Sequence, residues 1–129
     1  MVRVLLAEDD RDTHEAVRQA LGDEGYEVTS AYDGQAALDA LGAATTPMVV
    51  LLDLYLGLVG GATVLRTVAA NAHLTARNRY IVVTAVPSNS VDVPHDLLAQ
   101  LAIPFIAKPF DLAELLAEVK RAADSLPPA

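Results

Sequence analysis

Polar residues directly follow four separate hydrophobic runs of this chain, and their chemical types suit one shared site. The four positions are Glu8-Asp9-Asp10 after Val2–Ala7, Asp53 after Met48–Leu52, Thr84 after Tyr80–Val83 and Lys108 after Phe105–Ala107. Carboxylates that lie close together raise one another's pKa unless a cation neutralises them. Mg²⁺ suits such a cluster, because proteins hold it with one or two carboxylates and leave the rest to water and phosphate oxygens. A carboxylate beside that metal can attack phosphorus, so the four positions predict a cation-dependent phosphoryl acceptor.

Asp53 is the expected nucleophile of this site. The metal and a cationic side chain would offset the negative charge that spreads over the phosphoryl oxygens during transfer. Lys108 can supply that cation: it follows an apolar segment and precedes Pro109, so a carboxylate or phosphoryl partner explains it better than solvent does. Ala85, directly after Thr84, leaves room for a group the size of phosphate.

The elements that must position these residues are short apolar strands alternating with helical patterns. Strands are expected at 2–7, 27–32, 48–52, 80–84 and 105–107. This alternation predicts an α/β fold with a doubly wound, five-stranded parallel sheet and helices on both faces. In the flavodoxin-like order 2-1-3-4-5, strands one and three flank the switch point, and ligands bind at the carboxyl ends of the strands.

Helices are expected between the strands and after the last one. The first begins at Asp10 to Asp12, with Glu15 completing a capping box, and stops near Gly22. Others run from Gly34 to about Gly42, through Leu65 and Val68, from Pro94 to Leu101, and from Asp111 to about Ser125. We therefore expect one domain over residues 1–125, with 126–129 as a tail or the start of a linker.

Composition narrows the class of protein. The chain has 129 residues, of which 53% are hydrophobic and 20% charged, as in a globular domain. Its net charge of −8, with nine scattered basic residues, argues against direct binding to nucleic acid. Its apolar runs are too short to cross a membrane. The lack of cysteine fits a cytoplasmic protein.

The acidic pair, the aspartate, the threonine and the Lys-Pro occur in an order and spacing that resemble the receiver domain of response regulators in two-component signalling, as in chemotaxis receivers. The resemblance covers essentially the whole chain. It implies that Asp9 is the principal acidic Mg²⁺ ligand, helped by Glu8. Asp53 would be both a ligand and the phosphorylation site, and the Tyr55 carbonyl would be the third protein ligand.

The resemblance also implies how the phosphorylated state is held and read. Thr84 and Lys108 would bind phosphoryl oxygens, and Thr84 would switch together with Phe105, the aromatic residue three positions before the lysine. Tyr55 and Val86, each two residues beyond a site residue, would screen the phosphoryl group from water. The three histidines, His14, His73 and His95, are expected to be ordinary surface residues.

The implied function is that of a signalling phosphoprotein in a phosphorelay. A histidine kinase or histidine phosphotransfer protein would donate the phosphoryl group, and the domain would catalyse only its own phosphorylation and dephosphorylation. A changed interaction surface would then reach a downstream protein or an output domain absent from this chain, and a phosphorylation-dependent homodimer is a further expectation.

Two other classes share parts of this pattern. A haloacid-dehalogenase-type hydrolase also forms an aspartyl phosphate, but its Asp-x-Asp motif and cap insertion are missing here, because Glu8-Asp9-Asp10 has another pattern. A flavodoxin-like FMN binder needs a phosphate-cradling loop after the first strand, where residues 8–12 would instead repel phosphate.

The chain also departs from the family's pattern in two segments. Gly57-Leu58 stands where Pro-Gly is usual, which predicts a pliable loop over 57–61. Thr84 and Lys108 are 24 positions apart (108 − 84), about two more than usual, so the 86–104 segment is unusual.

Overall fold

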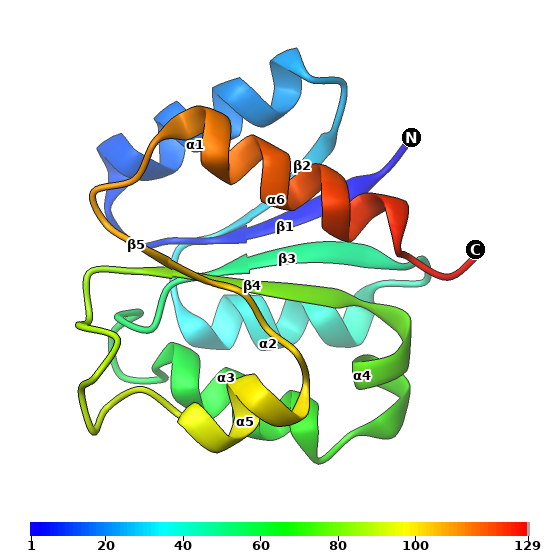
Figure 1. Ribbon diagram of the computed structural model, residues 1–129. Helices are drawn as coiled ribbons and strands as arrows, with labels where there is room; N and C mark the ends of the chain where they lie inside the picture. The colour runs from blue at the N-terminus through cyan, green and yellow to red at the C-terminus, as the bar shows by residue number, and fades with distance from the viewer. Residues whose placement is uncertain (129) are drawn as a thin grey trace.

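The computed structural model describes residues 1–128 and consists of a central sheet between two layers of helices (Figure 1). All five strands are parallel and lie in the order β2-β1-β3-β4-β5, as predicted. The strands are β1 (Arg3–Ala7), β2 (Glu27–Ala31), β3 (Met48–Leu52), β4 (Arg79–Thr84) and β5 (Phe105–Ala107).

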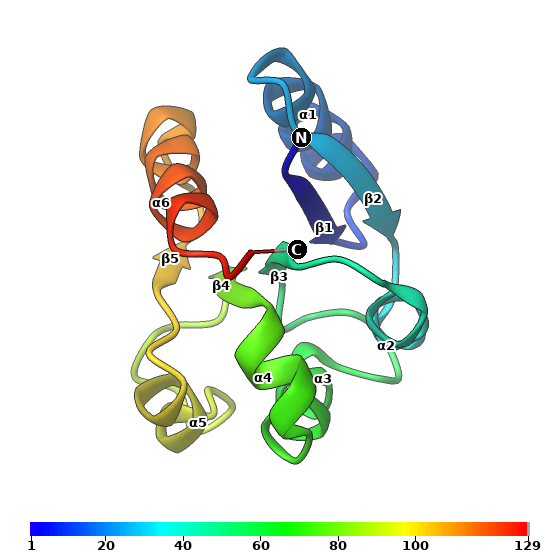
Figure 2. The ribbon, with the colours of Figure 1, turned by 90° about the vertical axis from the view of Figure 1, so that its right-hand side faces the viewer.

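Helices cover both faces of the sheet (Figure 2). One face carries α1 (Arg11–Asp23) and α6 (Leu112–Asp124). The other carries α2 (Gly34–Ala43), α3 (Gly61–Ala69), α4 (Ala72–Arg77) and α5 (His95–Gln100). Each face has its own hydrophobic cluster, so the sheet separates two halves of the core.

Strand β3 feeds both halves of this core. All five of its side chains are buried, and they alternate between the clusters: Val49 and Leu51 lie in the one under α1 and α6, and Val50 and Leu52 in the other. Successive side chains of a strand point to opposite faces, so a central strand covered on both sides must be apolar throughout. This is why Met48–Leu52 is a continuous apolar run.

The strand register brings the predicted site residues to one edge of the sheet. Ala7 pairs with Leu52, and Thr84 pairs with Ala107. The residues that follow Ala7, Leu52 and Ala107 therefore emerge together, at the edge opposite the two chain ends in Figure 1.

Helix α4 is an element that the sequence analysis did not predict. Its six residues follow Asn71, whose side chain accepts hydrogen bonds from the backbone N–H groups of His73 and Leu74. This capping arrangement satisfies donors that a helix start leaves free. The helix is too short to show a clear apolar period, and the Asn71 cap was its only signal.

The start of α1 differs from the predicted capping box. Asp10 is the N-cap residue, and its side chain accepts from the Thr13 hydroxyl rather than from a backbone N–H. Glu15 pairs with Arg18 on the helix surface. The prediction that Glu15 completes a capping box is therefore wrong, although the helix begins where expected.

Two glycines hold the loop after β3 in place. A Cβ at Gly61 would lie 2.1 Å from the Asp53 carbonyl oxygen, and one at Gly34 would lie 1.9 Å from that of Val59. Gly57 lies between the two contacted residues, Asp53 and Val59, and has φ +83, a backbone conformation that favours glycine. The loop that was expected to be pliable is thus packed tightly at two points.

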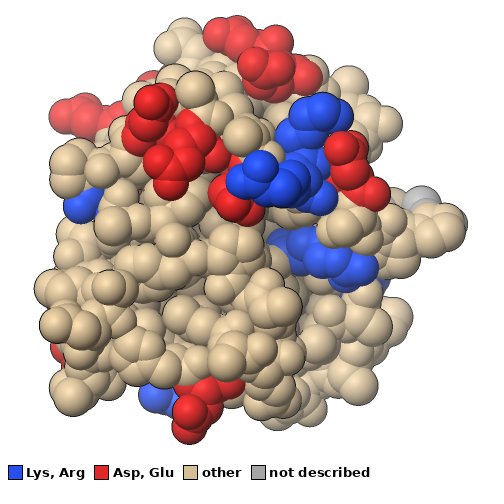
Figure 3. Space-filling view, viewed as in Figure 1, with Lys and Arg blue, Asp and Glu red and all other residues tan. Residues whose placement is uncertain are grey.

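Charged side chains are unevenly spread over the face in Figure 3. Acidic groups, with basic groups beside them, gather over the upper half, where α1 and α6 lie, and the lower half shows only a small charged group at its base in this view. Within residues 1–128, no helix combines the length and the apolar character needed to span a membrane.

Candidate functional site

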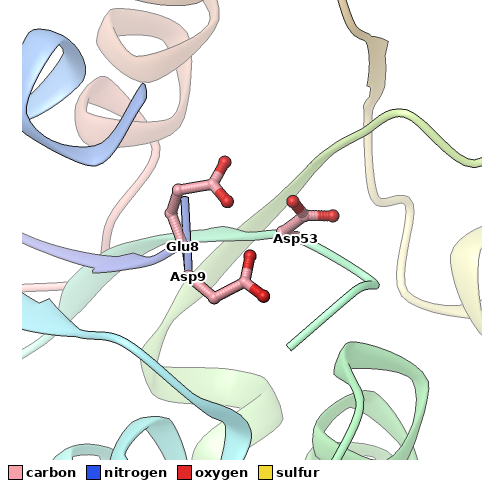
Figure 4. A group of neighbouring side chains, drawn as sticks. All are labelled: Glu8, Asp9 and Asp53. Atoms are coloured by element: carbon pink, nitrogen blue, oxygen red, sulfur yellow. The ribbon is translucent and has the colours of Figure 1, made fainter. Parts of the chain in front are cut away.

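Three carboxylates meet where β1 and β3 end (Figure 4). Glu8 and Asp9 follow β1, Asp53 follows β3, and each offers an oxygen within 4.8 Å of the others. Glu8 and Asp53 are only 4% exposed, whereas Asp9 is exposed. The structure therefore brings together the three acidic residues that the sequence predicted to share a site.

Lys108 reaches the same place from the end of β5. Its Nζ donates a hydrogen bond to Asp53 Oδ2 at 2.7 Å and also forms an ion pair with Glu8. Its backbone N–H donates to the Thr84 carbonyl at 2.9 Å, which ties the β5–α6 loop to the end of β4. Lys108, for which the sequence predicts a carboxylate or phosphoryl partner, thus pairs with two carboxylates in this structure.

The electrostatics of the pair follow from burial and charge. Burial raises the pKa of Glu8, with the Asp53 charge adding to the rise, and the hydrogen bond from Lys108 offsets only part of it. For Lys108, burial alone would lower the pKa, but its bonds to Asp53 and Glu8 outweigh that effect and raise it. Both partners thus hold their protons more tightly than in water.

Backbone contacts fix the Asp53 carboxylate. The Asp53 N–H donates to the Ala7 carbonyl at 3.1 Å, which locks β3 to β1 at the site. The Tyr55 N–H donates to Asp53 Oδ1 at 3.1 Å, while Oδ2 accepts from Lys108. Tyr55 lies beside the site with its side chain 55% exposed, and its carbonyl as a metal ligand remains a prediction.

Thr84 touches this site through its backbone carbonyl, which accepts from the Lys108 N–H, but its hydroxyl is bonded elsewhere. It is fully buried, and its hydroxyl oxygen accepts a hydrogen bond from the Val86 N–H at 3.3 Å. Val86 is itself 1% exposed and packs in the core cluster, so Tyr55 alone of the two expected screening residues reaches solvent. Phe105 is half-buried against the same cluster.

One histidine is not where the sequence analysis placed it. His73 and His95 are exposed, as expected, but His14 is 0% exposed and its ring is bonded to the backbone of Glu8. The expectation of a surface residue was wrong for His14. A signal existed: positions 14, 17 and 21 lie on one helical face, and Val17 and Leu21 are both buried.

Comparison with known proteins places this site in a family. The sequence model of the response regulator receiver domain matches residues 4–120. The response regulator MprA of Mycolicibacterium vanbaalenii is 35% identical over 119 residues, which are 92% of this chain and 49% of that protein. MprA of Mycobacterium tuberculosis H37Rv is 34% identical over the same lengths. The chain thus spans about half the length of these curated relatives.

Solved structures agree with the sequence relatives. The receiver domain of the sensor histidine kinase PA1611 from Pseudomonas aeruginosa PAO1, described with a magnesium ion coordinated in its active-site cleft, matches with a TM-score of 0.79 and 26% identity, over 96% of this chain and 98% of that one. TrrA of Thermotoga maritima, in complex with Mg²⁺ and BeF, matches with a TM-score of 0.76 and 25% identity, over 95% and 99%. With its parallel sheet, its acidic cluster and these matches, the chain belongs to the response regulator receiver domain family.

Proposed function

We propose that Asp53 accepts a phosphoryl group from a histidine kinase or a histidine phosphotransfer protein in a Mg²⁺-dependent reaction. The observation that carries this proposal is the setting of the Asp53 carboxylate. It is buried, it lies 2.7 Å from the Lys108 ammonium, and it shares a site with two further carboxylates.

The three carboxylates suit a small divalent cation, because they offer hard oxygen ligands from two neighbouring strand ends. Glu8, Asp9 and Asp53 would hold Mg²⁺, and the Tyr55 carbonyl would complete the protein ligands. The bound ion would offset the charge of the phosphoryl oxygens. The magnesium ions described for the PA1611 receiver and for TrrA support this assignment.

In the reaction, a carboxylate oxygen of Asp53 forms a bond to phosphorus as the phosphorus–nitrogen bond of the donor's phosphohistidine breaks. Lys108 would move from the carboxylates toward the new phosphoryl oxygens. The Thr84 hydroxyl would leave the Val86 N–H and donate to another of those oxygens. This rotation of the Thr84 side chain would change the packing beside Phe105. The surface around β5 would change with it, and a downstream protein, a second copy or an output domain would bind that surface.

An open hollow of about 570 Å³ beside Lys108 suits the donor protein. It is mostly apolar and lies between the first turns of α1 and the β5–α6 loop, lined by Thr13, Ala16, Val17, Ala85, Lys108, Pro109, Phe110 and Leu112. A donor helix seated here would bring its phosphohistidine to Asp53. We propose that this meeting takes place in the cytoplasm and that the domain turns over no other substrate.

The test is labelling with a small phosphodonor. Incubation with acetyl phosphate and Mg²⁺ should add one phosphoryl group to the wild-type protein, as detected by intact mass. Asp53→Asn should abolish the label, because the amide is a poor nucleophile. Asp12→Asn, an equal charge change at an exposed position of α1, should label like wild type. Undiminished labelling of Asp53→Asn would refute the assignment.

A further inference from the structure

His14 is a fully buried polar side chain that the proposed chemistry does not use. It lies on the first turn of α1, and both ring nitrogens have partners. Nδ1 is 2.8 Å from the Glu8 carbonyl oxygen, and Nε2 is 2.8 Å from the Ser30 hydroxyl oxygen at the end of β2. The ring thus joins α1, the end of β1 and the end of β2.

The bonding partners define what each nitrogen does. A carbonyl oxygen can only accept, so Nδ1 carries a hydrogen and donates it to Glu8. In a neutral ring Nε2 is then an acceptor, and the Ser30 hydroxyl can donate a hydrogen bond to it. The ring also stacks on Tyr32, with centroids 4.2 Å apart and planes inclined by 21°. Its orientation is therefore fixed by two hydrogen bonds and one aromatic contact.

The bond from His14 falls on the peptide group that links two of the acidic residues. The Glu8 carbonyl belongs to the planar peptide that joins the Cα atoms of Glu8 and Asp9. A fixed direction of this carbonyl therefore fixes the plane of the peptide that links the two residues. On its other side, the Glu8 N–H donates to the Ala31 carbonyl at 3.1 Å. The N–H and the carbonyl of Glu8 are thus both hydrogen-bonded, and the Cα that carries its side chain lies between these two groups.

We propose that His14, held by Ser30, is a positioning residue for the cation site of Glu8, Asp9 and Asp53. This inference rests on the proposed function. It assigns His14 the task of fixing the peptide from which two of the three carboxylates project. Contacts that orient metal ligands in this way typically change metal affinity by about 10-fold or more when they are removed.

Two variants of His14 separate positioning from mere filling of the core. In His14→Asn, the amide nitrogen occupies the level of Nδ1 and can still donate to the Glu8 carbonyl, but it cannot reach Ser30. In His14→Gln, the amide lies one bond further out, so it can reach Ser30 but not Glu8. Both replace a buried ring by an amide, so both should lose thermal stability in EDTA by similar amounts.

The measurement is the affinity for Mg²⁺ by isothermal titration calorimetry, together with the melting temperature in EDTA. His14→Gln should weaken Mg²⁺ binding about 10-fold, and His14→Asn should stay within about 3-fold of wild type, although both melt earlier. Equal affinities for the two variants, whether both wild-type or both weakened, would overturn the proposal.

Ser30→Ala keeps the test decisive if either His14 variant fails to fold, because Ser30 is exposed and its loss leaves the core intact. It should weaken Mg²⁺ binding by about 3-fold, since the ring loses one of its two hydrogen bonds. Unchanged affinity would overturn the role of Ser30 in holding the ring. A wild-type protein that binds no Mg²⁺ would instead refute the proposed function itself.

Discussion

The Lys108 ammonium nitrogen lies 2.7 Å from Oδ2 of Asp53 while it also pairs with Glu8, a residue 100 positions away along the chain. One cation therefore links the proposed nucleophile to a proposed metal ligand. A divalent ion entering this cluster would compete with Lys108 for the same two carboxylates. The two cations are thus coupled through shared oxygens.

Replacement of Lys108 should impair switching more than folding. Lys108→Ala leaves two buried carboxylates without the hydrogen bonds of a partly exposed ammonium, so we expect a loss of about 2 kcal/mol in the free energy of unfolding. Added Mg²⁺ should recover more stability in this variant than in wild type. Circular dichroism checks the fold, and amide hydrogen exchange around Phe105 with Mg²⁺ and beryllium fluoride checks the switch.

The exposed Lys120, which pairs with Asp124 on α6, provides the matched control. Lys120→Ala should fold and switch like wild type. Global unfolding of Lys108→Ala would show that Lys108 is a structural residue, and normal exchange changes in it would show that switching does not need its charge.

Mg²⁺ should stabilise the folded protein through the acidic cluster. At a concentration ten times its Kd, a ligand selective for the folded state adds about 1.4 kcal/mol, which is roughly 5 °C in Tm for a domain of this size. Asp9→Ala should lose most of this shift and Asp12→Ala none of it. Equal shifts in the two variants would place the metal elsewhere.

Stability should fall at alkaline pH because of Tyr80 and Lys108. Burial raises the pKa of Tyr80 above its ordinary value near 10, and the pKa of Lys108 is also raised. Above pH 10 the unfolded chain therefore releases these protons before the folded protein does, so the free energy of unfolding decreases as pH rises. Below pH 10 neither group causes such a loss.

Tyr80→Phe should make this alkaline decrease shallower in urea unfolding series. At pH 7 the variant should lose about 1 kcal/mol, because the hydroxyl no longer donates to the Leu74 carbonyl, 3.0 Å away. Tyr26→Phe, at a half-buried position, serves as the control. Parallel pH slopes for wild type and Tyr80→Phe would exclude Tyr80 as a source of the decrease.

Tyr55 should set the lifetime of the phosphorylated state. Its bulky side chain beside Asp53 offers no carboxylate or amide to orient water, and placement of a reactant can supply several kcal/mol of barrier. Tyr55→Asn should speed the loss of the acyl phosphate roughly 10-fold, a barrier change of about 1.4 kcal/mol. The decay is followed in excess Mg²⁺ after removal of the phosphodonor.

Val86→Glu provides a contrasting variant. Because Val86 is packed in the core, a glutamate there should destabilise the fold instead of positioning water. A Tyr55→Asn variant that decays at the wild-type rate would show that this side chain does not control hydrolysis.

The site could be predicted because polar residues directly follow apolar strands. Asp53 and Lys108 stand out after runs such as Met48–Leu52, and parallel pairing necessarily brings such positions to one edge. The spacing of positions 14, 17 and 21 along α1 indicated that His14 is buried, but its hydrogen bonds could not be predicted, because they depend on Glu8 and Ser30, which lie on other elements. The bond between Thr84 and Val86 was missed for a similar reason, since it depends on how the following loop folds.

The strand register also determines where the chain tolerates a change in length. One residue inserted into β3 would move Asp53 by about 3.3 Å and turn the following side chains to the opposite face. By contrast, β4 and β5 keep their pairing, from Val82 with Phe105 to Thr84 with Ala107. They do so although the segment between Thr84 and Lys108 is about two residues longer than is usual for the family. Insertions between 88 and 91, where the chain is mostly exposed and lies between the buried Val86 and Val93, should therefore leave the site in place, which makes that stretch suitable for grafting a reporter peptide.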